Sequence, residues 1–395
     1  MNQTLIKNIN IWTMDERDSR FFGWMLLENG KIVSMGEGEP PAMPVMIDGD
    51  VIDGEGGVLT PGLIDIHSHI GLYEDGLGFE GADGNEDTDP ATPHLRALDG
   101  VNPFDRSFHE ALEAGVTAAA VSPGSANPIG GQIALLKMAG RRVDDMILKA
   151  PLAIKFALGE NPKSVYHDKD ETPVTRMATA GIIREELYKA KEYFSRKARA
   201  ENDPDQDEPD FDIKMEALQP LLWGKAEAHF HAHRADDIFT ALRIAKEFGL
   251  RAVIIHGTEA HLVADLLAEE HVPVVSGPYM TDRSKPEIRN LSDAAPGLLC
   301  KAGIETAITV DHPEIPLRLL PMALMLAVRA GMDKTDALRA VTSVPAKIAG
   351  MQDRIGSLKT GLDADCVLWS GDPLDIATQV QAVFVNGAPE YRRTK

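Results

Sequence analysis

The pattern of hydrophobic and polar positions divides the chain into three parts. Up to residue 60 the apolar positions are spaced for strands: Leu5–Trp12 is broadly alternating, and Glu28-Asn29-Gly30-Lys31 is typical of a hairpin turn. Short apolar runs at 51–53 and 57–60 predict two further strands, and no helical period occurs in this part. The sequence therefore predicts a β structure for the beginning of the chain.

From Pro61 onward, short apolar strands alternate with helical segments. The segment Asp236–Phe248 carries apolar residues at helical spacing, and 108–114 and 262–267 are similar. Buried strands are predicted at 118–121, 152–157, 252–255, 272–275 and 307–310. Alternation of this kind predicts a parallel sheet, either open or closed into a barrel.

The tail returns to a strand pattern at 364–369 and 380–385, followed by the turn Asn386-Gly387. β segments at both ends of an α/β middle suggest one small domain built from the two termini. A length of 395 residues fits a barrel, which takes about 250 residues, together with such a companion. We therefore expect a (β/α)8 TIM-like barrel at 61–353 and a small β-sandwich domain formed by 1–60 and 354–395.

Three polar segments are predicted to be loops. Glu74–Pro93 is rich in Gly, Asp and Glu, and Glu201–Asp212 is an acidic run expected on the solvated surface. Asp282–Ala295 is polar and is a candidate lid.

The composition and net charge of the chain exclude some classes of binding partner. With 61 acidic and 40 basic residues the formal net charge is -21, which argues against nucleic acid and anionic membranes as partners. The two cysteines are far apart, no apolar stretch reaches the ~18 residues of a membrane span, and the first residues do not resemble a signal peptide. We expect a cytoplasmic enzyme with a small-molecule substrate; the sequence leaves a homo-oligomer open.

The pair His67 and His69 is the sharpest chemical signal. Both follow the apolar strand that begins Pro61-Gly62-Leu63-Ile64, and side chains two apart in a strand point the same way, as does Asp65. Two imidazoles on one face of a strand end are well placed to chelate a metal ion.

Other metal-binding residue types follow later strands. His229, His231 and His233 precede the helix at 236–248, His256 follows the strand at 252–255, and Asp311 follows the strand at 307–310. In α/β barrels the catalytic groups lie at the carboxyl ends of the strands. This ordered set suits zinc, or iron or manganese, and one or two such ions would lower the pKa of a bound water.

Two residues are candidates for an oxygen ligand between two metals. Lys155 lies inside an apolar strand, where an unpaired ammonium is costly, so we expect it to be neutralised, paired or chemically modified. Glu160 follows just past the end of the same strand. Either residue could supply the ligand, and the two-residue period of the strand slightly favours Lys155.

The run Pro61-Gly62-Leu63-Ile64-Asp65-Ile66-His67-Ser68-His69 resembles the first-strand metal motif of the amidohydrolase superfamily, within it the imidazolonepropionase-like group. The likeness continues through His231, His256 and Asp311, and through the closing segments 342–347 and 354–365. It implies that His67, His69, His231, His256 and Asp311 bind metal. Relatives bridge two metals with a carboxylated lysine or a glutamate, so Lys155 and Glu160 are the candidates here.

The resemblance implies hydrolysis of a C–N bond in a cyclic amide, a dipeptide or an N-acyl amino acid. Asp311 would carry the proton, and His256 or His233 would stabilise the oxyanion. The alternatives are a deaminase of the same superfamily or a non-catalytic scaffold barrel. A Rossmann nucleotide-binding protein is disfavoured, since no G-x-G-x-x-G follows the first strand.

Overall fold

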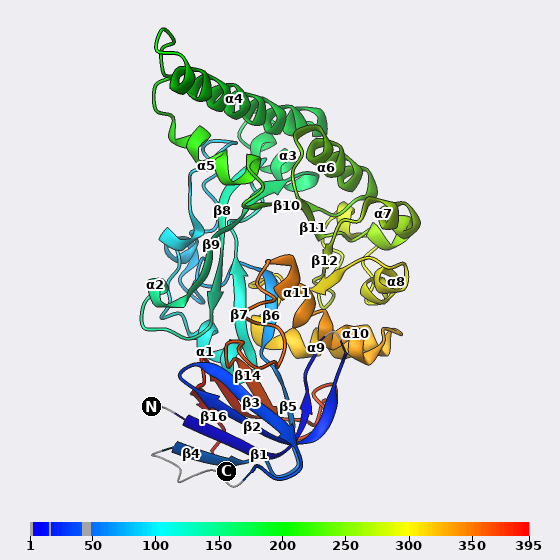
Figure 1. Cartoon of the computed structure of the whole chain (residues 1–395). Helices are drawn as coiled ribbons and strands as arrows, with labels where there is room; N and C mark the ends of the chain where they lie inside the picture. Colours follow the sequence, from blue (N-terminus) through cyan, green and yellow to red (C-terminus); the bar gives the residue numbers. More distant parts are fainter. Residues whose placement is uncertain (1–2, 16, 42–48, 395) are drawn as a thin grey trace.

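The computed structural model describes residues 3–15, 17–41 and 49–394 and contains two separate eight-stranded sheets. One sheet curls into a nearly closed barrel, and the other is built from the two ends of the chain and lies beneath it in Figure 1. This arrangement confirms the predicted fold class. The boundaries at residues 60 and 353 stay predictions.

The barrel strands follow one another around the ring in chain order. They are β6 Leu63–Ser68, β7 Val116–Val121, β8 Ile129–Lys137, β9 Ile147–Ala157, β10 Glu227–Ala232, β11 Ala252–His256, β12 Val274–Ser276 and β13 Thr306–Ile308. Most of their residues are buried on both faces, which explains the short apolar runs that the sequence shows.

One barrel strand departs from the all-parallel order expected of a (β/α)8 barrel. β8 runs antiparallel to both β7 and β9, whereas the other neighbouring strands are parallel. The connections 122–128 and 138–146 are too short for a helical crossover of a dozen or more residues, so the chain turns back on itself twice. β9 consequently regains the direction of β7, and the carboxyl ends of β6, β7, β9 and the later strands share one end of the barrel.

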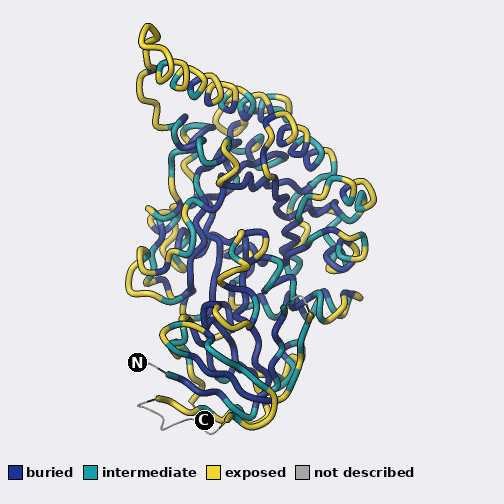
Figure 2. The backbone as a smooth tube through the Cα atoms, viewed as in Figure 1, coloured by how far each residue is buried: buried dark blue, intermediate teal, exposed yellow. Residues whose placement is uncertain are grey.

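Helices cover the outside of the ring (Figure 1). They are α1 Arg106–Glu113, α2 Val143–Met146, α3 Glu160–His167, α4 Arg176–Asn202, α5 Ile213–Leu222, α6 Ala235–Phe248, α7 Ala264–Glu270, α8 Ala295–Lys301, α9 Leu320–Arg329 and α10 Lys334–Arg339. Helix α11 Ser343–Ile348 instead lies at the opening of the ring, where Ala346 and Ile348 pack in one cluster with strand residues such as Ile66 and Ile255. In the described part of the chain, no helix combines the length and the apolar character needed to cross a membrane. The acidic run Glu201–Asp212 is almost wholly exposed at the free end of α4, as expected (Figure 2).

The terminal sheet has the strand order β16-β15-β14-β5-β1-β2-β3, with β4 also paired to β1. Its strands are β1 Gln3–Trp12, β2 Arg20–Glu28, β3 Lys31–Glu37, β4 Gly49–Asp53, β5 Val58–Pro61, β14 Cys366–Trp369, β15 Val380–Val385 and β16 Ala388–Arg392. Asn29 and Gly30 both have positive φ at the predicted hairpin turn, where Asn-Gly is the preferred pair. β5 pairs with β14, which joins the two ends of the chain directly.

A buried ion cluster ties the barrel to the terminal sheet. The ammonium of Lys137, at the end of β8, lies 2.9 Å from a carboxylate oxygen of Asp363 and 2.9 Å from one of Asp365, and it also donates to the Asn386 side chain. All three charged side chains are at most 4% exposed. The cluster therefore satisfies charges that water does not reach.

Replacing Lys137 with methionine should lower the free energy of unfolding by roughly 3–5 kcal/mol, because Asp365 loses its cationic partner while still buried. Equilibrium urea unfolding measures this loss. Lys347→Met is the matched control: that lysine pairs with Glu305 but is 67% exposed, so its loss should change stability little. Equal stabilities of the two variants would contradict this role of the cluster.

Candidate metal centre

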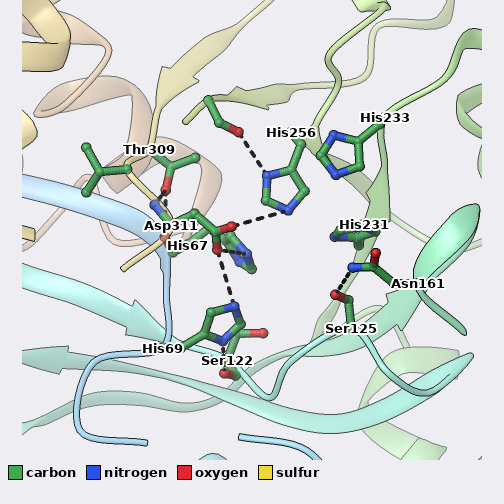
Figure 3. A network of polar contacts seen from close by, with 12 residues as sticks. His67, His69, Ser122, Ser125, Asn161, His231, His233, His256, Thr309 and Asp311 are labelled. Carbon is green, nitrogen blue, oxygen red and sulfur yellow. Dashed lines mark hydrogen bonds and ion pairs between the residues drawn. The ribbon is translucent and has the colours of Figure 1, made fainter. Parts of the chain in front are cut away.

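Histidines and one aspartate converge at the carboxyl end of the barrel, where Figure 3 shows them facing one another. His67 and His69 come from the end of β6, His231 and His233 from the end of β10, and His256 is the last residue of β11. Asp311 follows β13. Residues up to 244 positions apart in the sequence thus meet because strand ends share one edge of the barrel.

Asp311 lies at the centre of this group. Its Oδ1 is 3.2 Å from Nε2 of His67 and 3.3 Å from Nε2 of His69, and its Oδ2 is 4.0 Å from Nε2 of His256. The potential ligand atoms of His67, His256 and Asp311 all lie within 4.8 Å of one another, and so do those of His231, His233 and His256. The structure therefore offers two overlapping groups that could each hold a metal ion.

Hydrogen bonds fix the backbone beneath these side chains. The amide of Asp311 donates to Oγ1 of Thr309, and that hydroxyl donates to the carbonyl of His67. The carboxylate of Asp65 accepts from the amides of His67 and Val310. Since no ladder joins β13 to β6, these bonds close the barrel at the site. Burial raises the pKa of Asp65 to about 7, and its role here is to hold the two strand ends together.

Two residues of the centre have unusual backbone conformations. His256 has a φ of 72° and Asp311 a φ of 55°, in the left-handed region that side chains other than glycine's rarely adopt. Such a conformation costs on the order of 1–3 kcal/mol and persists only where its surroundings enforce it. Here it directs both side chains into the shared centre.

Carbonyl groups set the tautomers of two rings. Nδ1 of His69 lies 2.6 Å from the carbonyl oxygen of Ser122, and Nδ1 of His256 lies 2.9 Å from that of Gly277. A carbonyl only accepts, so each Nδ1 carries a proton, and each Nε2 faces Asp311. This arrangement is the usual one for histidines that bind metal through Nε2.

Burial keeps the imidazoles neutral. It lowers the pKa of His67, His231 and His233 well below the usual value and that of His256 to about 4. For Asp311, burial acts to raise the pKa, but the neighbouring His256, His67 and His69 outweigh it and hold it well below the usual range. At neutral pH the site thus offers neutral nitrogens and one carboxylate.

Several of these buried atoms have no hydrogen-bond partner among the described residues. They are both ring nitrogens of His67, Nε2 of His231, Oδ1 of Asp311 and Nζ of Lys155. Oδ1 of Asp311 is close to the two histidines, but the geometry is not that of a hydrogen bond. An unsatisfied buried polar atom costs about 1–3 kcal/mol, and divalent cations would satisfy one ring nitrogen of His67, Nε2 of His231 and Oδ1 of Asp311. The donor set therefore fits a metal centre.

Lys155 lies at this centre and Glu160 does not. Lys155 is completely buried in β9, and burial lowers its pKa to about 8. Glu160 begins α3, and its Oε2 accepts from the amide of Glu287, 3.4 Å away, so the carboxylate belongs to neither metal-binding group. His229 pairs in register with Lys155 and contacts Glu227, and it too is outside both groups.

A cavity of about 450 Å³ opens over the centre. His69, His231, His233, His256 and Asp311 line one part of it. Other polar side chains that the sequence did not single out also line it, among them Tyr73, Asn85, Ser125, Asn161, Lys285 and Glu314. Two of them come from the predicted loops Glu74–Pro93 and Asp282–Ala295, but no spacing rule marks a single polar residue in a loop as part of a site.

Comparison with known proteins identifies the family of the chain. The pattern of the Amidohydrolase family matches residues 221–391. The crystal structure of an amidohydrolase from Thermotoga maritima MSB8 superposes with a TM-score of 0.94 at 44% identity, covering 99% of this chain and 100% of that one. The imidazolonepropionase of Idiomarina loihiensis is 25% identical over 99% of this chain and 98% of its own length.

The amidohydrolase tasK of Hapsidospora irregularis is 30% identical over 98% of this chain, which spans only 43% of that protein's length. The relatives thus share the barrel as well as the terminal sheet. The chain belongs to the amidohydrolase superfamily of hydrolases that act on carbon–nitrogen bonds, in its imidazolonepropionase-like group.

Proposed function

We propose that this chain is a metal-dependent hydrolase of small amides: a cyclic amide, a dipeptide or an N-acyl amino acid. The observation that carries the proposal is the group of buried, unpartnered histidine and aspartate atoms at the mouth of the barrel. Neutral imidazoles with a carboxylate suit zinc best, and iron and manganese are the other ions that fit. A bound divalent ion supplies a Lewis acid and a water whose pKa is lowered toward neutrality.

If two ions bind, the ligands that the family resemblance implies would divide between them. His67, His69 and Asp311, which lie close together, would hold one ion, and His231 and His256, which belong to one potential ligand group, would hold the other. Lys155 would bridge them after its neutral amine reacts with carbon dioxide to give a carbamate and a proton. A pKa near 8 leaves a useful share of that amine uncharged at neutral pH.

Asp311 would act as the proton carrier. It would accept a proton from the attacking water and return it to the leaving nitrogen, a task for which an ionised, centrally placed carboxylate is suited. The neutral ring of His256 has one N–H proton, on Nδ1, and donates it to the carbonyl of Gly277, so Nε2 has no proton to donate. The oxyanion would therefore be stabilised by His233. Its Nδ1 lies 2.8 Å from the Thr258 hydroxyl, and when Nδ1 accepts that proton, the N–H at Nε2 can donate to the oxyanion.

A substrate screen tests the proposal. Zinc-loaded protein should release a free amine or a new carboxylate from at least one member of a panel of N-acetyl amino acids, dipeptides and cyclic amides. The turnover should disappear with a chelator and return with zinc. Ammonia release from aminopurines or aminopyrimidines, with no amide hydrolysed, would instead identify a deaminase. Binding without any turnover would identify a scaffold.

A further inference from the structure

A continuous set of polar side chains lines the cavity beside the metal centre and has no part in the proposed proton transfers. It runs from Tyr73 through Asn85, Ser125 and Asn161 to Lys285. Figure 3 shows the Asn161–Ser125 bond on the side of the centre where His231 lies. These five side chains form the polar wall of the cavity, and the direction of each hydrogen bond decides which donors and acceptors this wall offers to a ligand.

The orientations of both asparagine amides are fixed by their neighbours. The amide of Ala126 can only donate, so it identifies Oδ1 of Asn85 and leaves Nδ2 to donate to the Tyr73 oxygen at 2.7 Å. The Lys285 ammonium likewise only donates, at 2.8 Å to Oδ1 of Asn161. Nδ2 of Asn161 therefore donates to Oγ of Ser125 at 2.7 Å.

The hydroxyls of Tyr73 and Ser125 consequently act as acceptors and keep their own protons. No acceptor for either proton occurs among the described residues, and both side chains line the cavity. Burial raises the pKa of Tyr73 to about 12, so the phenol stays protonated. The wall thus offers two hydroxyl donors to a ligand in the cavity.

Lys285 adds a positive charge to the same wall. Its ammonium has three protons and two partners, Asn161 and Oε1 of Glu287 at 2.9 Å. Glu287 is 1% exposed and its other oxygen accepts from the amide of Glu160, whereas the side chain of Lys285 is 29% exposed. A ligand in the cavity therefore meets the ammonium and not the carboxylate that holds it in place.

Lys285 brings a positive charge to the cavity that no other lysine or arginine among the described residues provides. The side-chain amide of Asn161 accepts from Lys285 and donates to Ser125, so one group holds both an N–H and an O–H donor in place. Two donors positioned by one amide, one of them charged, suit the two oxygens of a carboxylate.

We propose that Lys285 and Ser125 form a subsite for a carboxylate of the substrate. The inference rests on the proposed function and narrows it: the subsite favours N-acyl amino acids and dipeptides with a free carboxylate over neutral cyclic amides. Lys285 would be the specificity-determining residue, and the segment Asp282–Ala295, which carries it, would act in recognition.

Binding measured without turnover tests the subsite. Chelator-treated protein is titrated calorimetrically with the N-acetyl derivatives of glycine, leucine, phenylalanine and histidine, each as the acid and as the matching carboxamide. At least one acid should bind roughly tenfold to a hundredfold more tightly than its amide, the effect of a hydrogen bond to a charged group. Lys285→Gln, which keeps a donor beside Glu287 but removes the charge, should reduce the preference to less than about twofold.

Three further variants separate recognition from structure. Lys285→Arg keeps the charge and should keep most of the preference, and the surface variant Lys347→Met should keep all of it. Ser125→Ala leaves the Lys285–Glu287 pair intact and should weaken acid binding by roughly tenfold, with amide binding unchanged.

Two results would overturn the subsite: no acid binding more tightly than its amide in the native protein, or an equal preference in native protein and Lys285→Gln. The screen for amide hydrolysis is independent of this measurement. A Lys285-dependent preference for acids in a protein that hydrolyses no member of the amide panel would refute the proposed function and leave the carboxylate subsite standing.

Discussion

Replacing both His67 and His69 with alanine should remove most of the metal and nearly all activity. Protein purified without added metal or chelator should contain about one or two equivalents of zinc, iron or manganese per chain, measured by plasma mass spectrometry. The double variant should contain far less, because it loses two nitrogens that approach Asp311 at 3.2 and 3.3 Å. A Lewis acid contributes several kcal/mol to catalysis, so turnover should fall roughly a thousandfold or more.

Surface histidines provide the matched control. His109 and His167 are exposed on helices α1 and α3, and their double replacement with alanine should leave metal content and turnover unchanged. The metal count also reports on Lys155: two equivalents that fall to about one in Lys155→Met would support a bridging carbamate. Native protein that contains no metal, and takes up none on titration with zinc, would contradict the hydrolase proposal and favour a scaffold.

Asp311→Asn should lower kcat by roughly 10²–10⁴-fold, the range expected for loss of a general acid–base group. Asparagine has nearly the same shape and can still offer an oxygen to a cation, but it cannot carry a proton between water and the leaving nitrogen. The comparison is made as turnover per bound metal ion, so that partial loss of metal does not imitate loss of the proton carrier.

Asp265→Asn, at an exposed position of α7, is the control for the substitution itself and should have native turnover. Native turnover per metal ion in Asp311→Asn would show that another group moves the proton. The proposed mechanism would then lose its central step, although the metal centre would remain.

Local patterns were sufficient to predict most of the barrel and several of the side chains that converge at its carboxyl end, whose role as metal ligands stays a prediction. The hairpin turn at Asn29-Gly30 depends only on which residues tolerate positive φ, and the strands at 118–121 and 252–255 depend on short apolar runs. His67 and His69 were expected to point the same way because a strand alternates its faces, and both approach Asp311. Such features are encoded within a few residues of one another.

Other features had no local signal. The reversal of β8 depends on the length of its connections and on its neighbours in the closed sheet, not on its apolar pattern, which either direction would satisfy. The choice between Lys155 and Glu160 was open because both lie near one strand end. Their positions in the structure differ, because Lys155 is fully buried and Glu160 accepts a hydrogen bond from the backbone of Glu287, a residue 127 positions away. The bridging role of Lys155 stays a proposal.

By itself the sequence determined which residue types stand at the strand ends, and hence that a metal centre could form there, since strand periodicity and strand-end position are local properties. Only the tertiary structure decided which hydrogen-bond donors the wall of the cavity offers to a ligand. That property depends on hydrogen bonds whose partners lie far apart in the sequence: Ala126 to Asn85, which orients the donor to Tyr73, and Lys285 through Asn161 to Ser125. The direction of each bond follows from which partner can only donate, and the sequence does not reveal those partners before the barrel brings the loops together.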